Sequence, residues 1–331
     1  MHVSPTAWLV TVAVMAVVLA FDLLVIGRRP HEPSMREAGI AIAVYSAAAM
    51  LFGLGVWAFS GPRFAGEFFA GWLTEYSLSV DNLFIFVIIM SNLRVPRKLQ
   101  QYALMIGIVL ALVFRGIFIA VGAAAIEAFS WIFFVFGAFL IWTAWKLFRD
   151  YFEHSDDDEA TDNAMLRWVK ASFPSTDSFH GTKLIIANPD ATASAKRLIT
   201  PMLFVVIALG STDLLFALDS IPAIYGLTQE PYLVFTANVF ALMGLRQLYF
   251  LIGGLLQKLI YLSIGLSVIL AFIGVKLVLH AMHEYQLDER LGFSGEIPIW
   301  LSLVVIVGTL AITTVASLVK SARDERRAAE S

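Results

Sequence analysis

Four carboxylate residues lie inside long apolar stretches of this sequence. Glu75 and Asp81 share one stretch and Asp213 and Asp219 another, so both pairs have the spacing acid-x5-Asp. A charged side chain at the centre of a bilayer costs roughly 2.5–3.5 kcal/mol on insertion scales. Carboxylates kept in such a place are expected either to take up a proton or to hold a cation.

Two arginines, Arg115 and Arg246, also lie within apolar stretches. Pairing them with the acids would give buried ion pairs that merely hold helices together. However, four acids and two arginines leave two formal negative charges, so pairing alone does not neutralise the set. The surplus favours a functional role in binding cations or protons.

The types of oxygen beside these acids indicate which ion they would bind. Asn82 follows Asp81 and Ser220 follows Asp219, and carboxylate, amide and hydroxyl oxygens suit hard divalent ions such as Mn²⁺, Mg²⁺ or Ca²⁺. The sequence contains no cysteine and no histidine in the middle of an apolar stretch, which argues against Zn²⁺ and Cu⁺. We expect a transported ion rather than a resident cofactor, with no catalytic residues. The predicted metal ligands are Glu75, Asp81, Asn82, Asp213, Asp219 and Ser220.

Residues six positions apart on a straight helix are separated by about 9 Å along the helix axis and by about 240° around it. One ion therefore cannot easily touch both acids of a pair, so the acids either form successive stations along a path or flank a break in the helix. Pro222 favours a break near Asp219, because proline cannot donate a helical hydrogen bond. We then expect Asp81 and Asp219 to meet at the ion site.

Four further residues are candidates for gating or charge pairing. Arg115 and Arg246 would neutralise part of the acid cluster and release it when helices move, and Asn238 shares a helix face with Arg246. Lys276 and Lys146 both lie near the end of a span and are followed by a leucine. The simpler interpretation of Lys276 is that its side chain extends to the membrane interface. His280, His283 and Glu284 have ligand-like spacing and could form an outer metal station, but interfacial histidines often have no such role.

The composition places these residues in a membrane protein. Of 331 residues, 59% are hydrophobic and only 15% are charged, and the mean hydropathy is +0.78. The net charge of −3 offers no basic surface for nucleic acid. We expect an all-α, polytopic transmembrane bundle of about nine spans, near residues 6–26, 38–59, 66–91, 99–122, 126–147, 198–225, 231–256, 260–282 and 297–319.

Lysine and arginine predict the orientation of this bundle. The segments after odd-numbered spans carry 18 of these residues and the opposite segments carry 2, Arg63 and Arg290. By the positive-inside rule, the N-terminus faces outward and the C-terminus faces the cytoplasm of the cell whose inner (plasma) membrane holds the protein.

An internal repeat organises the chain. The order acid-x5-Asp, then an arginine one span later, then Lys-Leu another span later occurs twice, ending at Lys146 and at Lys276. Because each copy has three spans, the copies are inverted in the membrane, which is typical of secondary transporters. The predicted units are 1–64 (two spans), 65–148 (first repeat), 149–197 (cytoplasmic loop), 198–283 (second repeat) and 284–331 (outer loop, last span and tail).

The loop at 149–197 carries no catalytic motif. Its stretches beginning at Lys183 and Lys196 flank the turn signal Asn188-Pro189, which predicts a small β-hairpin. The acidic run at 156–159 is typical of a solvated loop, and its role stays open.

The sequence resembles the TerC family of integral membrane proteins, which is the tellurium-resistance-type group, and in particular the Alx-like branch of that family. The resemblance rests on the segments 75–82, 213–224 and 271–277 and on Phe173-Pro-Ser-Thr-Asp177. It implies manganese export with the intramembrane acids as the metal site, and also an association with tellurite resistance and with pH or redox stress.

Two functions from different classes remain. The first is export of a divalent cation, Mn²⁺ above others, by alternating access in exchange for protons. The second is a membrane stress-response or scaffold protein that acts through its cytoplasmic loop. A Gly-x-Gly-Asp motif and a serine–histidine pair at membrane depth are both lacking, which ranks an intramembrane hydrolase last.

Overall fold

The structure is a computed structural model that describes residues 3–28, 33–129, 131–153, 174–176, 178–188, 197–252, 259–287 and 297–330. Within these ranges, the side chains of residues 22, 23, 25–28, 81, 84, 153, 252 and 324–330 are outside the description.

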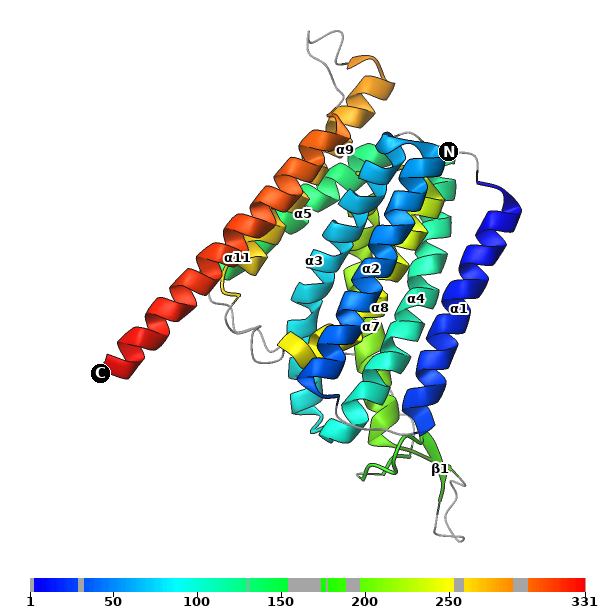
Figure 1. Cartoon of the computed structure of the whole chain (residues 1–331), viewed down its shortest axis with the longest axis vertical. Helices are drawn as coiled ribbons and strands as arrows, with labels where there is room; N and C mark the ends of the chain where they lie inside the picture. Colours follow the sequence, from blue (N-terminus) through cyan, green and yellow to red (C-terminus); the bar gives the residue numbers. More distant parts are fainter. Residues whose placement is uncertain are drawn as a thin grey trace.

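The described residues form nine long helices and one pair of short strands (Figure 1). The helices are α1 (Pro5–Arg28), α2 (Met35–Ser60), α3 (Pro62–Asn92), α4 (Arg97–Ala128), α5 (Ile132–Glu153), α7 (Pro201–Tyr225), α8 (Pro231–Ile252), α9 (Leu262–Glu284) and α11 (Ile299–Glu330). Each predicted span lies on one of them. Eight are long and apolar enough to cross a membrane, and α1 has a shorter apolar stretch at Pro5–Phe21. The predicted all-α polytopic bundle is therefore confirmed.

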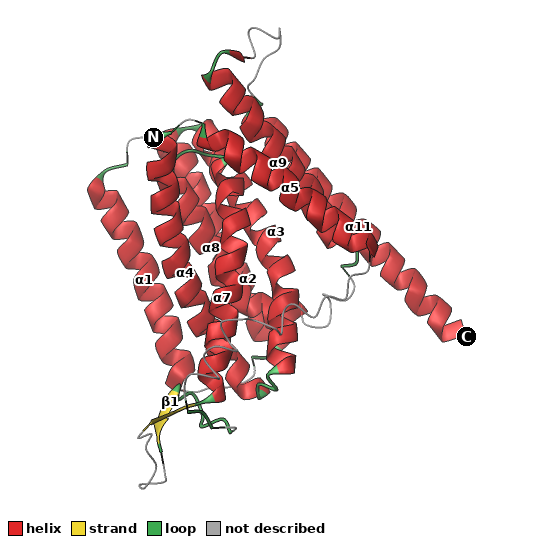
Figure 2. Ribbon diagram, turned by 180° about the vertical axis from the view of Figure 1, so that it is seen from behind, coloured by secondary structure: helices red, strands yellow, loops and turns green. Residues whose placement is uncertain are grey.

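The helices form two groups. Helices α1 to α4, α7 and α8 run side by side, whereas α5, α9 and α11 form a tilted group beside them, as views from both sides show (Figures 1 and 2). Helices α3 and α8 are the most buried of the candidate spans, and α11 and α2 are the least buried. The polar residues on α3 and α8 therefore lie at the centre of the protein.

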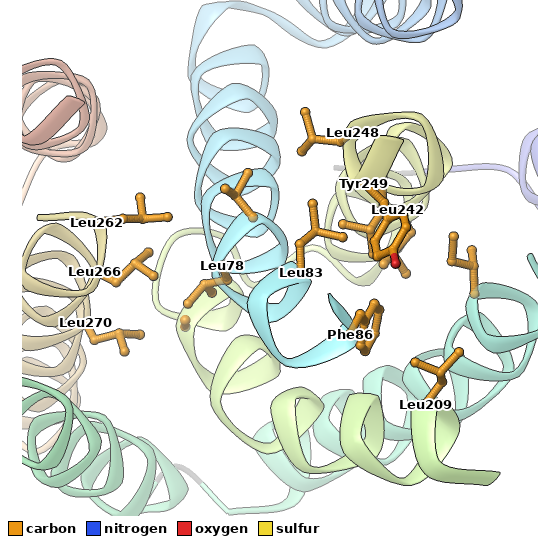
Figure 3. Packing of buried hydrophobic residues seen from close by; sticks show 14 of the residues in the cluster. Leu78, Leu83, Phe86, Leu209, Leu242, Leu248, Tyr249, Leu262, Leu266 and Leu270 are labelled. Carbon is orange, nitrogen blue, oxygen red and sulfur yellow. The ribbon is translucent and has the colours of Figure 1, made fainter. Parts of the chain in front are cut away.

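Apolar side chains of α3 join the two groups. Leu78 and Leu83 lie between leucines of α9 on one side and of α8 on the other, and Phe86 points toward Leu209 of α7 (Figure 3). All four belong to the same buried cluster. This packing fixes the rotation of α3 and so sets which of its polar residues face α4 and α7.

The contact between α5 and α9 is the most extensive between any two helices, and two glycines permit it. A Cβ atom on Gly137 would lie 2.8 Å from the carbonyl oxygen of Gly274, and one on Gly274 would lie 2.9 Å from that of Gly137. Small residues at such crossings let membrane helices approach to backbone contact.

The helix contacts keep their pattern when the two predicted repeats are exchanged. The repeats make α7, α8 and α9 the counterparts of α3, α4 and α5. The contact between α3 and α8 thus corresponds to the contact between α7 and α4, and α5 packs on its own counterpart α9. This pattern agrees with an inverted repeat, which itself stays a prediction.

The predicted hairpin in the loop is confirmed. Strands β1 (Ile185–Ala187) and β2 (Arg197–Ile199) pair antiparallel, with Ile186 opposite Leu198. The acidic run at 156–159 lies outside the described residues.

Candidate functional site

One arginine joins carboxylates from both predicted repeats. Arg115 on α4 donates from Nη1 to Glu75 Oε2 on α3 at 2.6 Å. The same guanidinium donates to Asp213 on α7, from Nε to Oδ2 at 3.2 Å and from Nη2 to Oδ1 at 3.3 Å. Glu75 and Asp213, which the repeat predicts to be equivalent, are therefore brought together, although 138 positions separate them.

All three of these residues are buried. Glu75, Asp213 and Arg115 have 0%, 2% and 1% of their surfaces exposed. Burying charges is costly, and a buried ion pair is weak evidence for stability because desolvation can exceed the Coulombic gain. Two carboxylates and one guanidinium leave a formal charge of −1, so Arg115 does not fully neutralise the group.

Close helix packing brings the three residues together. Gly107 on α4 lies against Leu209 on α7, at a distance of 3.3 Å from the Cβ position of the glycine. Gly71 on α3, one turn before Glu75, lies against Ile224 of α7 and Ala237 of α8. Helices α3, α7 and α8 thus meet close to the Glu75 carboxylate.

Several buried polar atoms on these helices have no hydrogen-bond partner among the described residues. Glu75 Oε1 and the Ser220 hydroxyl make no hydrogen bond of ordinary geometry, but Ser220 lies close enough to interact with this carboxylate. Others on these helices include Thr74 Oγ1, Ser77 Oγ, Ser79 Oγ, and both amide atoms of Asn238. Unpaired buried polar atoms are uncommon and costly, so they mark candidate ligands for an ion or water.

Asp219 lies on a different face of α7 from Asp213. It is partly exposed and accepts a hydrogen bond of 3.3 Å from Thr143 Oγ1 on α5. The two acids of this pair therefore contact different neighbours, as six positions on a continuous helix require.

The predicted break at Pro222 is wrong. Helix α7 continues through Pro222 to Tyr225, although Pro222 has no N–H to donate to the helix. Helix α3 is likewise continuous from Pro62 to Asn92. The acids of each pair therefore lie on one continuous helix, and their role as successive stations for an ion stays a prediction.

The side chain of Asp81 lies outside the described part of the structure, so the expected meeting of Asp81 and Asp219 stays a prediction. Asn82 is buried. In the part of the chain that the structure describes, no group of three or more histidine, aspartate or glutamate side chains lies close enough together to hold a metal ion.

Arg246 has a different environment from its predicted counterpart Arg115. When the Gln247 amide is oriented with its oxygen toward Arg246, that oxygen accepts hydrogen bonds from Arg246 Nε at 3.2 Å and from Nη2, and the Gln247 nitrogen donates to the Met243 carbonyl. Arg246 and Gln247 line a cavity of about 380 Å³ between α1, α2, α4 and α8, together with Gln101. Arg246 thus lines a cavity, whereas Arg115 is buried between two carboxylates and lines none of the described cavities.

Lys276 lies at the opposite end of the bundle from this cavity. Its Nζ donates to Ser302 Oγ on α11 at 3.3 Å, and it lines a cavity of about 820 Å³ together with His280 and Glu67. His283 and Glu284 are exposed at the end of α9 and do not line this cavity.

Glu67 is a buried carboxylate that sequence reasoning did not select. It accepts hydrogen bonds from Arg63 Nε at 3.0 Å and from Thr228 Oγ1 at 2.7 Å. The available signal was the i,i+4 spacing of Arg63 and Glu67, which is typical of a surface ion pair. Thr143, the partner of Asp219, carried no signal at all in the sequence.

Apolar helices long enough to span a bilayer, arranged around a buried ion-pair cluster, define a polytopic helical membrane protein. The chain belongs to the TerC family of integral membrane proteins, whose family profile matches residues 60–325. The match runs from α3 into α11 and so includes every residue of the Arg115 cluster.

Relatives from several bacteria match almost the whole chain. An uncharacterized membrane protein of Mycobacterium tuberculosis is 44% identical over 96% of this chain and 80% of its own length. One of Myxococcus xanthus is 39% identical over 96% of this chain and 93% of its own. Alx of Escherichia coli, which is named as a candidate membrane-bound redox modulator, is 34% identical over 94% and 93%. No solved structure matches this chain.

Proposed function

We propose that this protein exports a hard divalent cation, with Mn²⁺ as the leading candidate. It would do so by alternating access around intramembrane carboxylates, as a transporter rather than an enzyme. The observation that carries this proposal is the buried cluster in which Glu75 and Asp213 share Arg115. A group with a formal charge of −1 at the centre of apolar helices favours uptake of a cation or a proton.

The neighbouring oxygens support a hard ion. Ser220 lies beside the Glu75 carboxylate, and both residues are buried. Asn238, whose amide atoms have no partner among the described residues, lies on a helix that packs on α3. Oxygen ligands of this kind suit Mn²⁺, Mg²⁺ and Ca²⁺. We include Asp219 and Asp81 as further stations on the path, with Asn82 beside Asp81.

Arg115 gives this site a means of switching. Its guanidinium supplies the positive charge that a divalent cation would supply, so binding of the cation requires Arg115 to withdraw from at least one carboxylate. Glu75 and Asp213 lie on helices of different predicted repeats, and a movement of one repeat against the other would open this ion pair. Protons taken up by the same carboxylates from outside would return them to the starting state and couple export to proton entry.

The proposed orientation follows from the distribution of lysine and arginine. It places the N-terminus outside and the C-terminus in the cytoplasm, in the inner (plasma) membrane of a bacterium. The cavity beside Arg246 would then open toward the cytoplasm and the cavity beside Glu67 toward the outside.

The test is metal flux into vesicles that hold the purified full-length protein, with Mn²⁺, Mg²⁺, Ca²⁺ and Zn²⁺ compared, with and without a pH gradient. We expect Mn²⁺ flux that a pH gradient of the correct direction accelerates, and no flux with Asp213→Asn. Glu127→Gln is the matched control, because it also neutralises a carboxylate but lies exposed at the end of α4 and lines none of the described cavities. Equal flux in empty vesicles and in vesicles with the protein would overturn the proposal.

A second function is suggested by the name of the relatives called Alx. It is a membrane stress-response or scaffold role of the segment 149–197, in which the β1–β2 hairpin is described. Since the chain has no cysteine, a redox effect could not use its own thiols. Under this alternative, replacing residues 154–173 by a glycine-serine linker abolishes function, while Asp213→Asn is tolerated.

A further inference from the structure

A cavity of about 610 Å³ lies where the end of α3, the start of α4 and the end of α8 meet. Two arginines, Arg94 and Arg97, contribute to its lining, and the described residues that line it include no carboxylate. Its described lining therefore carries two cationic groups and no anionic group, whereas the linings of the other two cavities include both arginines and glutamates.

The turn that carries these arginines is held by hydrogen bonds to both helices. Arg94 has a φ of 50°, and its N–H donates to the Ser91 carbonyl at 3.0 Å. Gln100 Nε2 donates to the Val95 carbonyl at 3.1 Å, and Tyr249 Oη of α8 donates to Gln100 Oε1 at 3.2 Å. A left-handed conformation is uncommon for arginine, so these bonds determine where both arginines leave the backbone.

The start of α4 adds to the positive field. The helix begins at Arg97, directly after Pro96, and no side chain caps its first turn. The positive end of the helix dipole therefore lies beside the two guanidinium groups, an arrangement that favours an anion.

The other wall of the cavity is apolar. Val87 and Met90 of α3 and Phe250 of α8 line it, next to the arginines. The α3–α4 turn lies at the same end of the bundle as the β1–β2 hairpin (Figure 1), the end that the charge distribution predicts to be cytoplasmic. An apolar wall beside arginines at the membrane surface matches a phospholipid, whose phosphate adjoins its acyl chains, better than a free phosphate ion.

We propose that this cavity binds the headgroup of an anionic phospholipid. Arg94 and Arg97 contact the phosphate, and Val87, Met90 and Phe250 contact the first methylene groups of the acyl chains. Tyr249 and Phe250 lie three and four residues after Arg246 on α8. A lipid bound in this cavity would therefore contact the helix that carries Arg246.

The experiment measures lipid binding to the full-length protein in detergent by native mass spectrometry and by thermal unfolding. The probes are phosphatidylglycerol, phosphatidylcholine and inorganic phosphate. We expect phosphatidylglycerol to bind and to raise the unfolding temperature, and phosphatidylcholine and inorganic phosphate to have little effect. In Arg94→Gln/Arg97→Gln we expect phosphatidylglycerol to bind about thirty-fold more weakly.

Lys98→Gln is the matched control, since Lys98 is an exposed cation on the same turn of α4 that does not line the cavity. It should bind phosphatidylglycerol within about two-fold of the unmodified protein. Each single arginine variant should lose about five-fold. Equal loss in Lys98→Gln would mean that only net surface charge matters, and an equal effect of inorganic phosphate would mean that the site is not a lipid site. Either result, or unchanged binding in the double variant, overturns the proposal.

Discussion

Arg115 on α4 holds Asp213 on α7 through two parallel hydrogen bonds of 3.2 and 3.3 Å, across 98 positions of sequence. Both side chains are almost completely buried. A paired guanidinium and carboxylate in this geometry form a directional contact, so they fix how α4 and α7 are rotated relative to each other. The remaining nitrogen of Arg115 reaches Glu75, which extends the constraint to α3.

Removing the positive charge at this position should destabilise the protein. In Arg115→Gln, Glu75 and Asp213 would face each other inside the bundle without a cation, and breaking a buried pair in this way costs about 3–5 kcal/mol. We expect a lower thermal unfolding temperature in detergent and loss of Mn²⁺ export.

The double variant Arg115→Gln/Asp213→Asn should recover part of this stability, because one of the two uncompensated charges is gone. It should not recover export. If the single and double variants unfolded at the same temperature, the ion pair would not be the cause of the loss.

Neutralising Asp219 or Asp81, the two aspartates proposed to bind the ion along its path, should affect transport more than folding. We expect Asp219→Asn and Asp81→Asn each to leave a folded protein in the membrane and to abolish Mn²⁺ export. Asparagine keeps the shape of the side chain but not its charge. The measurement is the Mn²⁺ tolerance of cells at matched expression of each variant.

Thr143→Val provides a graded version of the same test. It removes the hydroxyl that donates to Asp219 but keeps the carboxylate. We expect reduced export, with roughly 1 kcal/mol or less lost in stability. Full tolerance in cells that carry Asp219→Asn would exclude Asp219 as a station, whatever the result for Thr143.

Arg246→Gln should affect the protein differently from Arg115→Gln. Arg246 lines a cavity of about 380 Å³, in which water can solvate the groups that its removal exposes, whereas Arg115 lines none of the described cavities. We expect a smaller loss of stability than for Arg115→Gln, together with slower export if the two arginines exchange roles during the cycle. An equal or larger drop in unfolding temperature would contradict this view of Arg246.

The crossing of α5 and α9 offers a test of packing that avoids charged residues. A methyl group on Gly137 or on Gly274 would meet the backbone of the other helix at less than 3 Å. We therefore expect Gly137→Ala and Gly274→Ala each to cost about 1–3 kcal/mol, measured as a shift in thermal unfolding. Gly308→Ala on α11 is the control, because no atom lies within 4 Å of its Cβ position. A similar shift in all three variants would mean that helix propensity or lipid contact, not the crossing, governs the effect.

The sequence alone determined the helices and the class of protein. Runs of about twenty apolar residues must become helices in a bilayer, because only a helix satisfies the backbone of a single lipid-exposed segment. The hairpin at β1 and β2 was also predictable, since a turn signal between two short apolar stretches is a local feature. The selection of Glu75 and Asp213 as candidate site residues followed from their charge in an apolar context, without any knowledge of their partners.

Only the tertiary structure decided which side chain faces which. The sequence suggested Asp81 and Asp219 as the converging pair, yet the contacts that the structure describes join Glu75 and Asp213 through Arg115 and direct Asp219 toward Thr143. Pro222 led us to predict a break in α7, but the helix is continuous. Membrane helices tolerate a proline where neighbouring helices pack around it. Spacing along one helix gives the angle between two residues, but the rotation of that helix against its neighbours depends on the packing of side chains from the whole chain.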